Sequence, residues 1–234
     1  MVGYDPRAMP SPLLHASQAR PADLSRVLCL VPVRALEGAK TRLGEALDAE
    51  ERRSLTERLL RRTVGAAAAV HGVALVAVVS PDPAALGVAA ASGAAALAQA
   101  TAGLNEALDE GCAWGRTIAA TALLVLPADL PRIDPAAVSA VLEAGRAAAA
   151  AAPDRPLVAL VPDRAGTGTN ALLVAPPGAI PFRFGPDSRA AHAAAAAEVG
   201  ATYLEVGGTL ALDLDTPDDL LLAGDPGDPP APRA

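Results

Sequence analysis

Aromatic side chains are scarce in this chain of 234 residues, at 2% of the sequence, although 52% of the residues are hydrophobic. The core must therefore be filled mainly by alanine, leucine and valine, with little help from ring stacking. Cysteine is scarce too, and Cys29 and Cys112 give neither a disulfide framework nor the spacing of a metal site. This usage favours a reducing cytoplasm.

Positive charge is in the minority, because 26 acidic residues outweigh 19 basic ones and give a net charge of -7. This balance argues against a non-specific nucleic-acid binder, which needs a concentrated basic face. No apolar run reaches the roughly 20 residues that span a bilayer, and the first 24 residues lack the pattern of a secretory signal. We expect a soluble cytoplasmic protein that is not exported.

The middle of the chain, residues 26–223, is predicted to form one domain, because no stretch rich in Pro, Gly or Ser divides it. Residues 1–25 carry four prolines and no periodic apolar pattern, and residues 224–234 consist largely of Gly, Pro and Asp. Both ends are therefore predicted to be flexible tails.

Apolar strands and helices alternate along this domain. Strands are predicted at 27–33, 75–79, 94–98, 122–126 and 157–161, and helices at 49–70, 104–117 and 135–152, with a short helix before residue 94. Beyond these, strands at 171–174, 202–206 and 210–214 accompany a helix at 188–199, and some antiparallel pairing is expected there. The pattern predicts an α/β fold with a mainly parallel sheet, helices on both faces and ligands at the carboxyl ends of the strands.

A cationic loop follows the first predicted strand and contains Arg34, Lys40, Thr41 and Arg42. Clustered Lys and Arg side chains stabilise polyphosphate charge, and the fork of an Arg can bind two oxygens at once. The glycine pattern of a Walker P-loop is missing. The loop is interpreted as a site for a nucleoside triphosphate, and a plain surface loop with scattered cations is the alternative.

Acidic residues follow two other predicted strands. Asp129 lies between two prolines that stiffen its backbone, and a rigid carboxylate there suits Mg²⁺, although Asp129 could instead cap the next turn. Alternation along the strand predicted at 210–214 would point Asp213 and Asp215 the same way. We favour metal binding for Asp213, and for Asp215 we favour the N-cap of the next helix over a metal ligand.

Two polar stretches interrupt the apolar chain: residues 163–170, with sequence DRAGTGTN, and residues 184–189, with sequence FGPDSR. Glycines let a ligand approach the backbone, and the second stretch leads into a helix whose N-terminus favours negative charge. We predict a phosphate or carboxylate site, with a tight turn and an N-capped helix as the alternatives. His192 lies one turn further on and is interpreted as a surface residue. Asn105 lies at the start of the helix predicted at 104–117, where it contacts a nucleotide or serves as a cap.

In this order, the motifs resemble the 2-phospho-L-lactate and phosphoenolpyruvate guanylyltransferases of coenzyme F420 biosynthesis. The resemblance runs from about residue 28 to residue 222 and rests on residues 39–43, 104–105, 129–131, 163–169, 184–188 and 213–217. The sequence departs from the family pattern at Arg34, where Lys is frequent, at Asn170, where small residues also fit, and at Ala128, where Gly is expected. None of these departures removes a needed charge.

The resemblance implies a three-layer nucleotidyltransferase fold similar to glycosyltransferase-A domains, with a mostly parallel mixed sheet. It also implies GTP and Mg²⁺. By position, Thr169, Gly185 and Ser188 would hold the acceptor, and Asp129 and Asp213 would hold the metal. Asp215 follows as a weaker metal candidate.

The implied reaction transfers GMP from GTP to phosphoenolpyruvate or 2-phospho-L-lactate and releases pyrophosphate. No general base is required, because the attacking phosphate is already ionised and the barrier lies in aligning two anions. Asp129, Lys40 and Arg42 are then the catalytic residues, and Arg34 and Asn105 join Lys40 and Arg42 in binding the nucleotide. The Ala-rich and Arg-rich composition is typical of a high-GC actinobacterium, which favours phosphoenolpyruvate. The alternatives are a transferase for another phosphorylated metabolite and a non-catalytic nucleotide-binding regulator. In every case we expect no nucleic-acid or membrane partner, and either a monomer or a homodimer.

Overall fold

The computed structural model describes residues 21–38 and 40–223. Residues 1–20 of the first predicted tail and the whole of the second, 224–234, lie outside the described residues. The elements in chain order are β1 (Val27–Pro32), η1 (Thr41–Leu43), α1 (Ala49–Ala68), β2 (Val73–Ser80), α2 (Pro83–Ala91), β3 (Ala95–Ala98), α3 (Leu104–Thr117), β4 (Ala122–Val125), α4 (Pro135–Ala151), β5 (Leu157–Pro162), β6 (Thr169–Ala175), α5 (Ser188–Glu198), β7 (Thr202–Glu205), η2 (Thr209–Ala211) and α6 (Pro217–Ala223).

A seven-stranded sheet runs through the domain in the order β3-β2-β1-β4-β6-β5-β7. Parallel pairs join β3 to β2, β2 to β1, β1 to β4 and β5 to β7, whereas β6 is antiparallel to both β4 and β5. The prediction of a mainly parallel sheet with antiparallel pairing near residue 171 is confirmed. Because β6 runs against its neighbours, its first residues lie at the edge where β1, β4 and β5 end.

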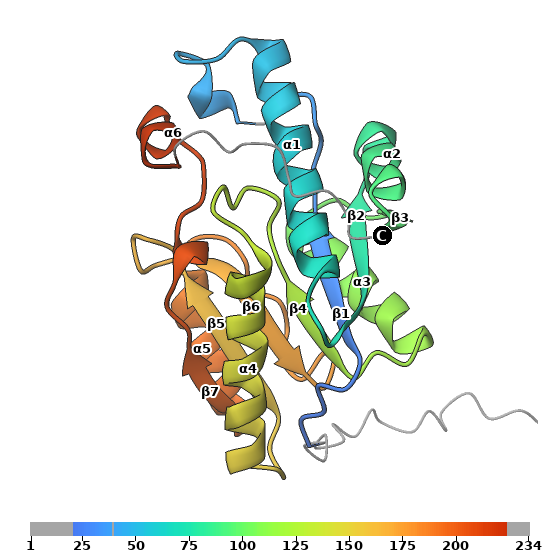
Figure 1. Cartoon of the computed structure of the whole chain (residues 1–234). Coiled ribbons are helices and arrows are strands. Elements are labelled where there is room, and N and C mark those ends of the chain that lie inside the picture. The colour runs from blue at the N-terminus through green and yellow to red at the C-terminus, as the bar shows by residue number, and fades with distance from the viewer. Residues whose placement is uncertain (1–20, 39, 224–234) are drawn as a thin grey trace, which may run out of the picture.

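Helices cover both faces of the sheet, so the domain has three layers, as predicted (Figure 1). Successive strand residues point to opposite faces: Val27 and Cys29 of β1 pack on the side of α1, α2 and α4, and Leu28 and Leu30 on the side of α3 and α5. Gly111 lets α3 lie close to the sheet, because a Cβ there would lie 3.0 Å from the side chain of Leu30. No helix of the described residues is long and apolar enough to cross a membrane.

The strand predicted at 210–214 is wrong. The chain forms the 3-10 helix η2 at Thr209–Ala211 and then runs irregularly to α6. Leu210 and Leu214 are both buried, but Leu210 joins the core beneath α4, whereas Leu214 packs with Leu43 and Leu55. The alternating leucines therefore fill two separate packing sites and do not mark a pairing strand.

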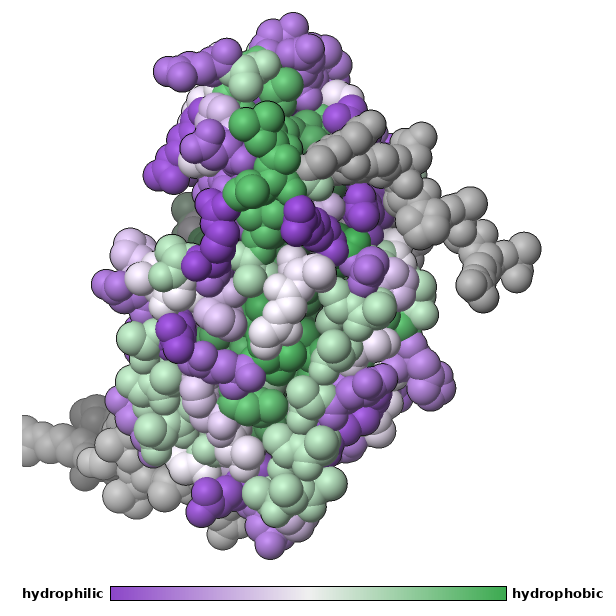
Figure 2. Space-filling model, turned by 60° about the vertical axis from the view of Figure 1, so that its left-hand side comes forward, coloured by the Kyte–Doolittle hydropathy of each residue, from purple (hydrophilic) through white to green (hydrophobic). Residues whose placement is uncertain are grey.

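Helix α6 is held by apolar packing and by two polar contacts, from Arg164 to the Asp219 carboxylate and from Arg132 to the Leu222 carbonyl. Leu220 packs against the cluster formed by η1, α1 and Leu214, while Leu221 and Leu222 remain 83% and 46% exposed. Figure 2 shows an apolar strip on the face of the molecule that carries α6. The packing of α6 holds in place the acidic segment at residues 213–215, which immediately precedes the helix.

Candidate active site

Asp129 and Asp213 meet at the edge of the sheet where the parallel strands end. Asp129 follows β4, and its carbonyl accepts a hydrogen bond of 3.0 Å from the amide of Leu214. From the start of β6, the Asn170 amide group donates to the Asp213 carboxylate at 3.3 Å and to the Leu210 carbonyl at 3.1 Å. Two acidic segments far apart in the sequence are thereby held in one site.

Lys40 supplies a cation to this acidic site. Its Nζ lies 2.8 Å from an oxygen of Asp129 and 3.1 Å from an oxygen of Asp215. Burial lowers the pKa of Lys40, but the two carboxylates more than offset that effect, and the pKa is raised above its ordinary value. The lysine is therefore fully charged at neutral pH and balances part of the carboxylate charge.

The carboxylates nevertheless outnumber the ammonium that balances them. Burial raises the pKa of Asp213, and the charges of Asp129 and Asp215 raise it further, against the opposing effect of the Asn170 hydrogen bond. This excess of negative charge favours a further cation, and carboxylate oxygens are the donors that Mg²⁺ prefers.

The donor set fits a metal that binds together with a nucleotide. Within the described residues, no three His, Cys, Asp or Glu side chains lie close enough together to hold a metal ion by themselves. Mg²⁺ is usually held by one or two carboxylates and completes its shell with water and substrate phosphates. Asp129 and Asp213 meet that requirement without a complete protein cage.

Asp215 does not cap α6, which corrects the sequence-based preference. The helix begins at Pro217, so Thr216 occupies the N-cap position, and its hydroxyl and amide donate to the Asp219 carboxylate at 2.7 and 2.8 Å. That carboxylate also accepts from the Asp215 amide at 3.2 Å and from Arg164 at 2.9 Å. Asp219 thus fixes the backbone of Asp215, and the Asp215 carboxylate remains free to pair with Lys40.

The two other cations predicted to bind the nucleotide are exposed. Arg34 follows β1 and Arg42 lies in η1. Ala39, the first residue of the predicted motif at 39–43, lies outside the described residues. The assignment of Arg34, Lys40 and Arg42 to the nucleotide stays a prediction.

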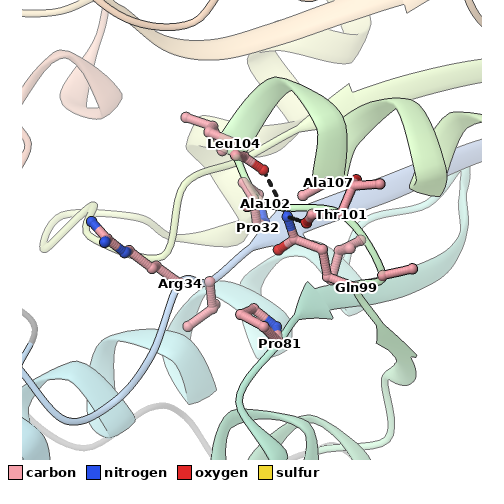
Figure 3. Close-up of a pocket in the computed structure, with 12 residues that line it drawn as sticks. Pro32, Arg34, Pro81, Gln99, Thr101, Ala102, Leu104 and Ala107 are labelled. Atoms are coloured by element: carbon pink, nitrogen blue, oxygen red, sulfur yellow. Dashed lines mark hydrogen bonds between the residues drawn. The ribbon is translucent and has the colours of Figure 1, made fainter.

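A cavity of about 620 Å³ opens where β1 and β2 end and α3 begins. Its walls include Pro32, Val79, Pro81 and Leu104. In Figure 3, Arg34 extends from the wall of the cavity with its guanidinium pointing away from Gln99. Pockets of this size with apolar walls and a few polar groups are typical of small-molecule sites.

The loop at residues 99–103 that lines this cavity is held from two sides. The side chain of Gln99 donates to the carbonyls of Thr101 and Gly103 (Figure 3). Glu110 on α3 accepts from the amides of Ala100 and Thr101 at 2.9 and 2.8 Å, and these bonds and that from the Thr101 hydroxyl lower the pKa of Glu110. Sequence reasoning missed Gln99 and Glu110, because neither residue belongs to a motif that marks a loop clamp.

The two polar stretches lie side by side, as the predicted anion site requires. The Arg189 amide donates to the Thr167 carbonyl at 3.0 Å, and the Arg189 guanidinium to the Gly166 carbonyl at 2.9 Å. Within the first stretch, the Asp163 carboxylate accepts from the Thr167 amide at 2.8 Å. The first stretch is therefore also a closed turn, and part of its polar backbone is used to build that turn.

Thr169, Gly185 and Ser188 gather where these two stretches meet. The hydroxyls of Thr169 and Ser188 lie 3.1 Å apart and are buried. Gly185 has a φ of 133°, which favours glycine, and a Cβ there would meet nothing within 4 Å. Asp187 is the N-cap residue of α5 but makes no side-chain cap bond, so the structure provides no side-chain cap for the alternative interpretation of this stretch as an N-capped helix.

His192 is fully buried, which corrects its interpretation as a surface residue. Its Nδ1 lies 3.1 Å from the Thr169 hydroxyl oxygen, and its Nε2 accepts a hydrogen bond of 3.0 Å from the Arg183 amide. The ring meets Phe184 edge to face at 5.0 Å. Burial and, secondarily, the charge of Arg183 lower the pKa of His192 to about 4.

Asn105 joins α3 to the second polar stretch. Its amide nitrogen donates to the Phe184 carbonyl at 3.1 Å, and its oxygen accepts from the Phe184 amide at 2.8 Å. Both ends of the Asn105 side chain are thus engaged by backbone. Its predicted contact with the nucleotide stays a prediction.

The sheet order places these features in a row. The cavity lies at β2 and β1, the carboxylates at β4 and β6, and the polar stretches at β6, β5 and the start of α5. The acidic residues and Lys40 therefore stand between an apolar cavity and the two polar stretches, at one edge of the sheet.

Solved nucleotide-sugar transferases share the fold of this chain. A putative nucleotide-diphospho-sugar transferase from Desulfovibrio desulfuricans G20 superposes with a TM-score of 0.64 at 17% identity, covering 81% of this chain and 82% of that one. Glucosyl-3-phosphoglycerate synthase from Mycobacterium tuberculosis, solved with Mg²⁺ and uridine diphosphate, gives a TM-score of 0.55 at 11% identity over 78% and 69% of the two chains. The fold is thus one whose solved members include a complex with a divalent metal.

Sequence comparison narrows this class to one family. A family model described as "Guanylyl transferase CofC like" matches residues 27–224. A phosphoenolpyruvate guanylyltransferase from Rubrobacter xylanophilus is 48% identical over 195 residues, which cover 83% of this chain and 91% of that protein. The chain belongs to the CofC-like guanylyl transferase family, as its motifs predicted.

Proposed function

We propose that this chain transfers GMP from GTP to phosphoenolpyruvate, as a step of coenzyme F420 biosynthesis. A phosphate oxygen of phosphoenolpyruvate attacks the α-phosphorus of GTP, and the bond from that phosphorus to the bridging oxygen of the β-phosphate breaks. Pyrophosphate leaves with the electron pair, and the product is enolpyruvoyl-2-diphospho-5'-guanosine. The observation that carries the proposal is the meeting of Asp129, Asp213 and Lys40 between the cavity and the two polar stretches.

On the donor side, the apolar cavity takes the nucleoside of GTP, and Arg34, Lys40 and Arg42 neutralise its triphosphate. Asp129 and Asp213 would hold Mg²⁺, with Asp215 beside them. When bound, Mg²⁺ neutralises and aligns the phosphate oxygens of two anions that would otherwise repel each other. The positive charges of the three basic side chains and of Mg²⁺ would thus gather around the GTP phosphates beside Asp129.

On the acceptor side, Thr169, Gly185 and Ser188 would hold phosphoenolpyruvate. Hydroxyl donors and the open glycine backbone suit a small acid with a phosphate and a carboxylate. The phosphate nucleophile is ionised at neutral pH, so positioning and charge neutralisation replace a general base. All residues assigned to the reaction come from one copy of the chain, and neither nucleic acid nor a membrane takes part.

The choice of acceptor rests on the relatives. The Rubrobacter xylanophilus protein carries the name phosphoenolpyruvate guanylyltransferase, and its identity to this chain extends over most of both sequences. That likeness favours phosphoenolpyruvate over 2-phospho-L-lactate, which differs only in geometry and hydrogens at C2 and C3.

The test is to incubate the protein with Mg²⁺, each of the four ribonucleoside triphosphates and each of the two acids, and to measure pyrophosphate. We expect release only with GTP, fastest with phosphoenolpyruvate, and a product whose mass is that of the acid plus GMP less water. Release with GTP and no acid would indicate hydrolysis and would contradict the proposal. A preference for 2-phospho-L-lactate would keep the transfer and overturn the acceptor.

A further inference from the structure

We propose that His192 is a positioning residue of the acceptor site, whose imidazole keeps one hydroxyl hydrogen of the Thr169 and Ser188 pair available for donation to the bound acid. The inference rests on the proposed function and assigns a role to a residue that does not itself touch the substrate. It is carried by hydrogen-bond geometry around the buried ring.

The first step is the tautomer of His192. A backbone amide can only donate, so Nε2, which lies 3.0 Å from the Arg183 nitrogen, must be unprotonated. The ring is neutral at physiological pH, because burial and the Arg183 charge lower the pKa to about 4. A neutral imidazole with an unprotonated Nε2 carries its hydrogen on Nδ1. Nδ1, 3.1 Å from the Thr169 hydroxyl oxygen and also facing the Ser188 backbone, therefore carries a hydrogen and cannot accept one from Thr169.

The second step counts hydroxyl hydrogens. Thr169 and Ser188 have two such hydrogens between them, and the contact of 3.1 Å between their oxygens uses one. Because Nδ1 of His192 carries its own hydrogen, neither hydroxyl spends one on the ring. One hydroxyl hydrogen is left for an anion.

The opposite tautomer would reverse this result. An unprotonated Nδ1 would draw the Thr169 hydrogen, and the Ser188 hydrogen would then be used on Thr169. The pair would present only lone pairs to a phosphate or carboxylate, which repel an anion. The tautomer of His192 thus decides whether this buried pair can bind an acid.

The third step is how the ring is held. The Arg183 amide fixes Nε2, and the Phe184 ring lies edge to face at 5.0 Å. Phe184 is in turn fixed by Asn105. His192 therefore connects β6, the start of α5 and the segment before Gly185, which are the parts of the chain that form the acceptor pocket.

The tautomer can be observed directly by nitrogen NMR of protein labelled with ¹⁵N-histidine at pH 7.5. His192 is identified as the signal lost in His192→Phe. We expect an Nδ1 that carries hydrogen and an Nε2 that does not. A hydrogen on Nε2, or a doubly protonated ring, would overturn the proposal.

Kinetics test the consequence. His192→Phe keeps a ring against Phe184 and removes both nitrogens, and we expect the KM for phosphoenolpyruvate to rise about 10-fold or more. The KM for GTP should change by less than about 2-fold. His192→Asn, which can again place an N–H near Thr169, should recover most of the loss. An unchanged KM for phosphoenolpyruvate in His192→Phe would refute the role.

A double-mutant cycle separates positioning from general damage to the fold. If His192 acts through Thr169, then His192→Phe in a Thr169→Val background should add less than about a 2-fold change to the KM for phosphoenolpyruvate. Independent, multiplying effects in an active enzyme would overturn the His192 inference alone. No pyrophosphate from the wild type with GTP and either acid would overturn the proposed function, and with it the role given to His192.

Discussion

Single residues at the sheet edge work against electrostatic repulsion. Burial raises the pKa of Asp213, and the nearby charges of Asp129 and Asp215 raise it further. Lys40 forms ion pairs with Asp129 and Asp215. Like charges held this close repel each other and lower stability, and a bound cation offsets the repulsion. The proposed Mg²⁺ would offset this repulsion.

Asp129→Asn should reduce turnover about 100-fold or more, because it removes the charge that Mg²⁺ and Lys40 share while keeping the shape of the side chain. Pyrophosphate release measures the effect. The matched control is Asp154→Asn, an exposed carboxylate between α4 and β5 at the opposite edge of the sheet. Equal activity of the two variants would refute the role of Asp129.

The sequence predicted these carboxylates because residue type and place coincided: Asp129 follows an apolar strand and lies between prolines. It gave no comparable signal for His192, which sits in an alanine-rich helix and looks like any exposed residue of that helix. Its burial depends on Thr169 and Arg183, which only the fold brings next to it. Contacts of this kind leave no local pattern in the sequence.

At the scale of elements, α3 and the loop before α5 are connected by one side chain. Asn105 makes two hydrogen bonds to the backbone of Phe184. Asn105→Ala should lower the free energy of unfolding by about 2 kcal/mol, at roughly 1 kcal/mol for each bond. Chemical denaturation measures this loss.

The same variant distinguishes two roles of Asn105. If it positions the acceptor loop, Asn105→Ala raises the KM for phosphoenolpyruvate and leaves the KM for GTP nearly unchanged. If it contacts the nucleotide, as the sequence predicted, the KM for GTP rises instead. Steady-state kinetics with each substrate varied in turn decides between them.

Most elements followed from apolar runs and their period, because a buried strand and an amphipathic helix leave different patterns. The failure at 210–214 has a physical cause: Leu210 and Leu214 are buried by different neighbours, and alternation alone cannot distinguish this from pairing in a sheet. The inference that Asp213 and Asp215 share one face fails with that strand. They reach one site instead through Asn170 and Lys40.

At the scale of the whole molecule, the reversed strand β6 connects the two halves of the site. Of its first residues, Thr169 contacts the Ser188 hydroxyl and Asn170 donates to Asp213. Because β6 lies between β4 and β5, the carboxylates stand between the cavity and the two polar stretches. In the proposed reaction, this topology would bring the two anions to the carboxylates from opposite sides.

Buried His192 also makes the stability of the whole domain depend on pH. Its pKa is about 4 in the fold and 6.5 ordinarily, so below pH 6.5 the unfolded chain takes up a proton that the folded chain does not. The stability that this shift contributes is fully present above pH 6.5 and falls toward pH 4, by roughly 2 to 3 kcal/mol at pH 4.5. Urea unfolding at pH 7.5 and 4.5 should show a smaller pH effect in His192→Asn than in the wild type. An equal effect in both would contradict the shift.

If Asp129 and Asp213 together hold a divalent cation beside GTP, both carboxylates should be needed for Mn²⁺ binding. Electron paramagnetic resonance can follow this binding in the presence of a non-hydrolysable GTP analogue. The account predicts one bound Mn²⁺ in the wild type, with affinity reduced about 10-fold or more in both Asp129→Asn and Asp213→Asn and unchanged in Asp154→Asn. Unaltered Mn²⁺ affinity in the first two variants would contradict it.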